Sequence, residues 1–157
     1  MWRLFSLIVI ATCASTPAFA GWEWTSWGMT QHAARLAAPT QPVRLDEPVE
    51  GSSLTMRLAV DIETAGIGFR ARLGFSAFGE LGLVEMRPVD DVRDCAAVAE
   101  ALARLHGAPV SRRVAPTQRL LWADADRDSL VEFTRDEAGA CLIRLMPLPR
   151  RNPYLRG

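Results

Sequence analysis

Three arginines, Arg57, Arg70 and Arg72, lie where the strand-like alternation of the sequence is strongest. The predicted pairing of the two strands places Arg57 opposite Arg72, with Arg70 next along the strand. Like charges that face each other are unfavourable, so either a carboxylate offsets them or the arginines meet an anionic ligand. Asp61, diagonal to Arg70, is the obvious internal partner. The arginines are therefore candidate binding residues, with an internally paired, solvated face as the favoured alternative.

Three tryptophans, Trp22, Trp24 and Trp27, cluster near the start of the predicted exported chain. Clustered aromatic side chains can form a stacking platform for a ligand or a contact for a partner protein. The alternative is that this segment docks onto the sheet and buries them, which we favour in a small domain that is short of core. The three tryptophans are kept as candidate binding residues.

His32 and His106 are the two histidines of the sequence, and they have no spacing typical of a metal site. We expect no metal and no cofactor. His106 ends the main predicted helix, where the dipole favours a polar residue. A small hydrolase with a site near His106 is an alternative function. A deep polar cleft holding His106 beside a serine or a carboxylate favours the hydrolase, whereas His106 at the surface of a filled core favours a binding module.

Other short motifs fall short of a site. Asp124-x-Asp126-x-Asp128 begins like a calcium loop, but Ser129 and Arg135 stand where such a loop needs Gly and Glu. We therefore expect an acidic hairpin turn. The residues from 74 to 78, Gly-Phe-Ser-Ala-Phe, lack the second glycine of a nucleophile elbow, and nucleotide-binding glycine motifs are missing. An enzyme is left uncertain, and a non-catalytic protein is favoured.

The first twenty residues predict a secretory signal peptide. Arg3 precedes an apolar run from residue 4 to 14, and Ala18-Phe19-Ala20 fits the cleavage pattern. We expect export to the periplasm with cleavage after Ala20, and no stable membrane insertion afterwards. An uncleaved anchor and lipidation at Cys13 are the alternatives.

Charge excludes one class of partner. The chain has 18 basic and 18 acidic residues, and loss of Arg3 with the leader leaves a slight acidic excess. A general nucleic-acid binder needs a basic face, so no nucleic-acid partner is expected.

Cys95 and Cys141 are the cysteines that remain after cleavage. In an oxidising compartment an even pair predicts a disulfide. The bond would tie the main helix to the last strand and stabilise the fold by roughly 4 kcal/mol in the chain-entropy picture. Two buried free thiols are the alternative.

Two helices are predicted, a short one at about 31–38 and the main one at about 91–106. Thr30 is the expected N-cap of the first, and Asp91 that of the second. Gly107 is expected at the C-terminal end, with Pro109 beyond it. One stripe of the main helix should face the core. Its expected residues are Val92, Cys95, Ala96, Ala99, Leu102, Ala103 and His106.

Alternation predicts the strands. They are expected at 54–63, 67–77, 81–87, 119–123, 129–135 and 140–146. A turn at 63–66 pairs Ile62 with Ile67 and Val60 with Phe69. The segments 38–53 and 110–117 are predicted to be a connection and a loop.

The predicted fold is α+β, with one or two antiparallel sheets of about five to six strands covered by the main helix. One domain spans 21–146, and 147–157 forms a mobile tail. No internal repeat is apparent in the sequence.

Trp27-Gly28-Met29-Thr30, then His106-Gly107-Ala108-Pro109 and later Trp122, resemble motifs of small uncharacterised exported proteins of Gram-negative bacteria. Those proteins carry Trp-Gly-Met-Ser/Thr after the signal peptide and a helix ending in Tyr-Gly-x-Pro, so His106 stands where Tyr is usual. The resemblance implies a periplasmic α+β domain and brings no catalytic residues.

Sequence and resemblance together predict a non-catalytic periplasmic domain. It would bind another envelope protein or a small ligand through its sheet face or its tryptophan cluster. An inhibitor of an exported enzyme is a further alternative.

Overall fold

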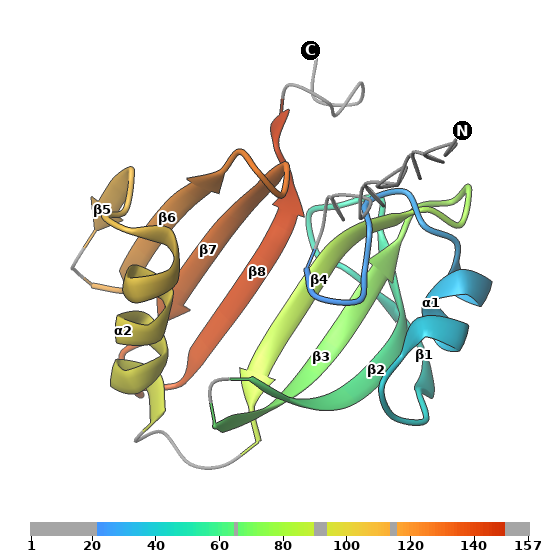
Figure 1. Cartoon of the computed structure of the whole chain (residues 1–157), viewed down its shortest axis with the longest axis horizontal. Helices are drawn as coiled ribbons and strands as arrows, with labels where there is room; N and C mark the ends of the chain where they lie inside the picture. The colour runs from blue at the N-terminus through green and yellow to red at the C-terminus, as the bar shows by residue number, and fades with distance from the viewer. Residues whose placement is uncertain (1–21, 65, 90–93, 114–115, 150–157) are drawn as a thin grey trace, which may run out of the picture.

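The computed structural model describes residues 22–64, 66–89, 94–113 and 116–149 (Figure 1). The predicted leader, the Asp91 cap, Val92 and residues 150–157 of the predicted tail lie outside these ranges. Neither of the two helices in the described ranges is long and apolar enough to cross a membrane.

Eight strands form one sheet, accompanied by two helices. The helices are α1 (Gln31–Ala37) and α2 (Asp94–His106). The strands are β1 (Val43–Pro48), β2 (Thr55–Thr64), β3 (Ile67–Phe75), β4 (Leu81–Pro88), β5 (Ser111–Arg113), β6 (Gln118–Asp124), β7 (Ser129–Arg135) and β8 (Cys141–Pro147). Their order is β1-β2-β3-β4-β8-β7-β6-β5, and all neighbours are antiparallel. The α+β fold is confirmed.

The chain repeats one arrangement twice, a helix followed by four antiparallel strands, although the sequence shows no repeat. The two halves meet where β4 pairs with β8, in a register of Val84 with Leu145, Glu85 with Arg144 and Met86 with Ile143. Figure 1 shows both helices on the viewer's side of the sheet, with α2 over the second half and α1 over the first. The main helix therefore covers only half of the sheet.

The apolar face of the sheet forms the core beneath the helices. Its largest fully buried side chains include Trp122, Phe75 and Phe133. The buried positions of α2 differ in part from the prediction, because Val98 is 2% exposed while Ala96 and Ala103 face solvent. The other contacts from α2 to the core are made by Cys95, Ala99 and Leu102.

The predicted count of five to six strands was wrong because the two outer strands, β1 and β5, have no apolar alternation. β1 lies in the segment expected to be a connection, and only its Leu45 is half-buried. All three residues of β5 are exposed. Backbone pairing with β2 and β6 holds these strands, and such pairing leaves no hydrophobic pattern in the sequence.

The β2–β3 hairpin has a tighter turn than predicted. Thr64 pairs with Ile67, so Ile62 lies opposite Phe69 instead of Ile67. From Leu58 to Thr64 the register has moved by two residues, which keeps the side chains on their predicted faces because side chains alternate with a period of two. A bulge between Met56 and Leu58 then places Met56 opposite Gly74, on the other face from the one predicted. Gly66 adopts φ +76° in this turn, a conformation that glycine takes without strain.

The predicted helix ends agree with the structure where it describes them. The Thr30 hydroxyl accepts from the Ala33 N–H at 3.2 Å. Gly107 has φ +77°, and its N–H donates to the Ala103 carbonyl.

The last strand ends one residue later than predicted. β8 includes Pro147, and the Leu148 N–H donates to the Asp128 carbonyl at 3.0 Å.

Candidate functional site

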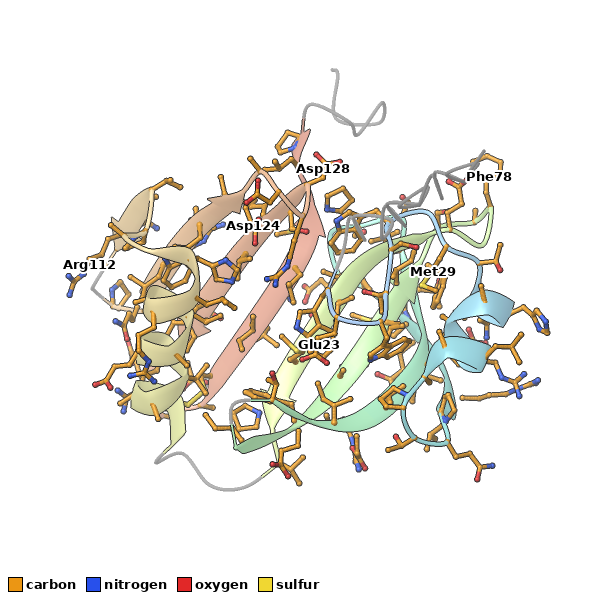
Figure 2. The ribbon with its side chains drawn as sticks, viewed as in Figure 1. Glu23, Met29, Phe78, Arg112, Asp124 and Asp128 are labelled. Atoms are coloured by element: carbon orange, nitrogen blue, oxygen red, sulfur yellow. A yellow bond between two sulfur atoms is a disulfide. The ribbon has the colours of Figure 1, made fainter. Side chains whose placement is uncertain are left out.

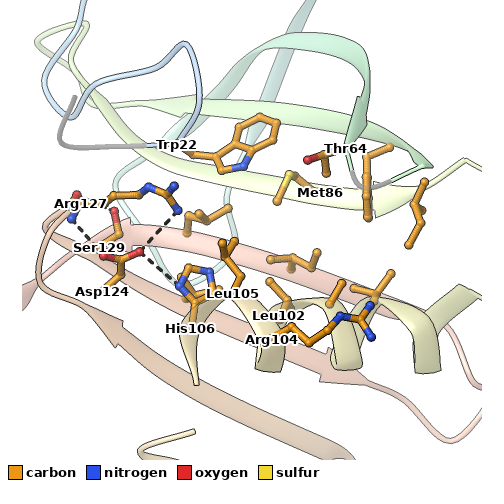
Figure 3. A pocket seen from close by; sticks show the side chains of 17 residues that line it. Trp22, Thr64, Met86, Leu102, Arg104, Leu105, His106, Asp124, Arg127 and Ser129 are labelled. Atoms are coloured by element: carbon orange, nitrogen blue, oxygen red, sulfur yellow. Dashed lines mark hydrogen bonds and ion pairs between the residues drawn. The ribbon is translucent and has the colours of Figure 1, made fainter. Parts of the chain in front are cut away.

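A cavity of about 430 Å³ lies between the two halves on the helix-covered face (Figure 3). Trp22 forms one wall, and α2 forms the opposite wall. Most of its lining is apolar. The apolar lining residues are Trp22, Ile67, Phe69, Met86, Val98, Ala101, Leu102, Leu105, Val131, Ile143 and Leu145. Volumes of this size are typical of small-molecule sites.

Trp22 is held in place by a tight local turn. The Thr25 hydroxyl donates to the Trp22 carbonyl at 2.7 Å and accepts from the Trp22 N–H at 3.1 Å. Thr25 is itself fully buried. The wall contributed by Trp22 is therefore an ordered part of the fold.

The other two tryptophans pack against the core, as the docking prediction expected. The indole N–H of Trp27 donates to the Ser129 hydroxyl at 3.0 Å. The indole N–H of Trp24 is buried and has no hydrogen-bond partner among the described residues. Of the three candidate tryptophans, Trp22 alone lines the cavity.

The polar end of the cavity is formed by His106 and Asp124 (Figure 3). Nδ1 of His106 lies 3.2 Å from Oδ2 of Asp124, and the two side chains are 8% and 13% exposed. A second cavity, of about 360 Å³, adjoins the same pair on the side of Asp126 and Arg127. Leu105, His106, Asp124 and Arg127 line both cavities.

The end of α2 is tied to the sheet, which explains why His106 is buried. The indole N–H of Trp122 donates to the Gly107 carbonyl at 2.9 Å, and the rings of His106 and Trp122 are 6.4 Å apart. The expectation of a polar His106 favoured only by the helix dipole was therefore incomplete, because the side chain is buried and paired. His32, by contrast, is exposed on α1.

Burial lowers the pKa of His106 from its ordinary value. The carboxylate of Asp124 opposes this change, while the nearby Arg127 cation adds to it. Since a carboxylate can only accept, the contact at 3.2 Å requires the proton of the neutral ring on Nδ1. The site therefore presents a neutral imidazole whose tautomer is set by Asp124.

We expect the His106→Phe variant to lose part of the acid sensitivity of the fold. The unfolded histidine takes up a proton near pH 6.5, whereas the folded one resists it. Wild-type stability should therefore fall as the pH drops below about 6.5, until the folded ring is also protonated. Urea unfolding between pH 7.5 and 5 measures this slope. His32→Phe is the control, and equal slopes for the wild type and His106→Phe would refute the prediction.

Ser129 shares the cavity, but its hydroxyl is engaged elsewhere. It donates to the Arg127 carbonyl at 2.8 Å and accepts from Trp27. The carboxylate of Asp124 also lies 3.6 Å from the guanidinium of Arg127 and accepts from the Arg127 N–H. At this site the imidazole of His106 pairs with the carboxylate of Asp124. The hydroxyl of Ser129 instead binds the indole N–H of Trp27.

The acidic motif forms the β6–β7 turn, as predicted. Asp124 and Asp128 lie at the same end of the two strands (Figure 2), and Asp128 has φ +51°. Asp124 contacts the side chains of His106 and Arg127. Within the described ranges, no group of three or more His, Cys, Asp or Glu residues is arranged to hold a metal ion.

The three candidate arginines lie on the opposite face of the sheet, away from the cavity. Arg57 pairs with Asp46, and Arg70 pairs with Asp61 at 2.8 Å. Arg72 pairs with Glu47 and lies 3.8 Å from Glu85. The hydrogen bond from Arg70 lowers the pKa of the Asp61 carboxyl.

The predicted opposition of Arg57 and Arg72 was wrong. Ala59 lies across from Arg72, and Asp61 lies directly across from Arg70 instead of on the diagonal. Two of the carboxylate partners, Asp46 and Glu47, come from β1, the strand that the sequence did not reveal. The structure therefore has the internal charge pairing of the favoured alternative.

No family model matches the chain, and no curated protein matches it. Among solved structures, a match is the crystal structure of a DUF4309 family protein (YjgB) from Bacillus subtilis subsp. subtilis str. 168. The TM-score is 0.47 and the sequence identity 11%, with 82% of this chain and 84% of that chain covered.

Proposed function

We propose that this protein is an exported, non-catalytic binding module that holds a small, mainly apolar molecule in the cavity between its two halves. The observation that carries this proposal is the cavity of about 430 Å³, which has apolar walls and a polar end at His106 and Asp124. Apolar cavities with a few convergent polar groups are the usual form of ligand sites.

Support for export comes from the leader-like first twenty residues and from the bond between Cys95 and Cys141. Structural disulfides persist in oxidising compartments such as the periplasm. The resemblance of the Trp27–Thr30 motif to exported Gram-negative proteins agrees with this location.

His106 is buried beside the carboxylate of Asp124 in a cavity that Ser129 also lines, which is the arrangement expected to favour a hydrolase. The mainly apolar lining and the contacts of Ser129 nevertheless favour non-catalytic binding. A hydrolase would need a nucleophile whose proton passes to His106. The hydroxyl proton of Ser129 instead meets the Arg127 carbonyl, and its oxygen accepts from Trp27. The pair of His106 and Asp124 is better suited to orient a bound molecule.

We expect the purified protein to bind the neutral fluorophore N-phenyl-1-naphthylamine saturably, and Ala101→Trp to weaken this binding at least tenfold. Ala101 lines the cavity, so an indole at that position fills space that the fluorophore needs. Fluorescence titration measures the two dissociation constants.

Ala103→Trp is the matched control, since Ala103 lies on the exposed side of α2. Circular dichroism should show both variants folded. Equal affinity of the two variants would place the fluorophore outside the cavity and overturn the proposed function.

A further inference from the structure

Four of the polar residues that line the cavity, His106, Asp124, Arg127 and Ser129, gather at one end near the β6–β7 turn, whereas Thr64 and Arg104 lie away from it (Figure 3). Most of their hydrogen-bonding capacity is already used. Asp124 accepts from His106 and Arg127, and Ser129 donates to a carbonyl and accepts from Trp27. Nε2 of His106 has no hydrogen-bond partner among the described residues. At this end of the cavity, this nitrogen is the acceptor left to meet a ligand.

The chemistry of Nε2 follows from the contact on the other edge of the ring. Nδ1 carries the proton that Asp124 accepts, so Nε2 of the neutral ring holds a lone pair. A ligand group that meets this lone pair must donate a hydrogen bond. An ionised carboxylate would meet it with a second lone pair, and Asp124 lies close by with its own negative charge.

We propose that the cavity takes an uncharged molecule with an apolar body and a hydroxyl group at one end, and that Nε2 of His106 accepts from this hydroxyl. The inference rests on the proposed binding function and names the ligand class of the same cavity. His106 is a specificity-determining residue in this arrangement, because it selects a donor over an acceptor.

The size of the cavity agrees with a medium-chain alcohol. A volume of about 430 Å³ holds on the order of ten to fourteen water-sized groups at about 30 Å³ each. The apolar body would lie between Trp22 and Leu102, with the hydroxyl at His106.

The other charged groups of the lining are engaged or open to water. Arg104 lies 3.9 Å from Glu100 on the exposed side of α2. Arg127 is 45% exposed and lies near Asp124. An anionic ligand would have to draw one of these arginines away from its carboxylate. The experiment must therefore distinguish binding of an anion from binding of an uncharged alcohol.

The test is displacement of N-phenyl-1-naphthylamine by 1-octanol and by its isomer 1-methoxyheptane. The two molecules have the same atoms and nearly the same shape, but the ether has no hydrogen to donate. One additional buried hydrogen bond should make 1-octanol about fivefold to tenfold tighter than the ether. The His106→Phe variant keeps a planar ring and loses the acceptor, so it should bind the two isomers equally. Sodium octanoate should displace the probe more weakly than 1-octanol.

Each outcome is decisive. Equal displacement by the alcohol and the ether in the wild type, or tighter binding of octanoate, overturns the inferred ligand class while the proposed binding function stands. Failure of the fluorophore itself to bind overturns both. The wild-type comparison needs no variant, so it decides the question even if His106→Phe does not fold.

Discussion

We expect the replacement of both Cys95 and Cys141 by alanine to lower the free energy of unfolding by about 4 kcal/mol. The bond joins residues 46 positions apart, and in the chain-entropy picture the cost of closing such a loop in the unfolded chain has this magnitude. It fastens α2 to β8, the strand at the junction of the two halves. Both cysteines are buried, so alanine also removes some packing.

Urea unfolding with and without a reductant separates the bond from the packing. The reductant should destabilise the wild type and leave the double variant unchanged. A wild type whose unfolding midpoint is insensitive to full reduction would contradict the prediction. Thiol titration under denaturing conditions provides the check that the bond was formed and then reduced.

Glu85→Ala should destabilise the fold by about 3 kcal/mol. Glu85 lies on the helix-free face of the sheet, yet its side chain is only 5% exposed. Its Oε1 accepts from Nε of Arg144 at 3.0 Å and lies 2.9 Å from Nη2 of the same guanidinium, and Arg72 lies near its other oxygen. Removing one member of a buried pair leaves the partner charge unmatched, which costs about 3–5 kcal/mol. The lower end applies because Arg144 is 41% exposed and can be hydrated.

Asp61→Ala is the matched control on the same face. It also removes a carboxylate from an arginine, but the side chains of Asp61 and Arg70 are both more than half exposed. Solvent screens such pairs, so this variant should barely change the unfolding midpoint. Equal destabilisation by the two variants would show that burial does not determine how much the pair of Glu85 and Arg144 contributes to the free energy of unfolding.

The parts of the fold that were predicted correctly depend on neighbouring residues in the chain. Thr30 begins α1 through a bond to its own first turn, and Gly107 ends α2 through its own backbone. Alternation identifies the strands that bury one face, such as β2 and β3. A local pattern is enough for each of these elements.

The parts that sequence reasoning missed depend on distant residues. β1 joins the sheet through its backbone, and its Asp46 and Glu47 then neutralise arginines of β2 and β3. His106 is buried because Trp122 holds the end of α2 against β6. The sequence offered one signal, since Asp124 stood out in the acidic motif, but nothing in the motif linked it to His106.

The junction of β4 and β8 gives the proposed ligand a thermodynamic role. On one face of this pairing lies the cavity, with Met86 from the first half and Leu145 from the second in its lining. On the other face the pair of Glu85 and Arg144 crosses the same junction. A molecule bound in the cavity contacts both halves at once, so its binding free energy stabilises the state in which the two halves are folded and joined. Occupancy of the cavity thereby couples the unfolding of one half to that of the other.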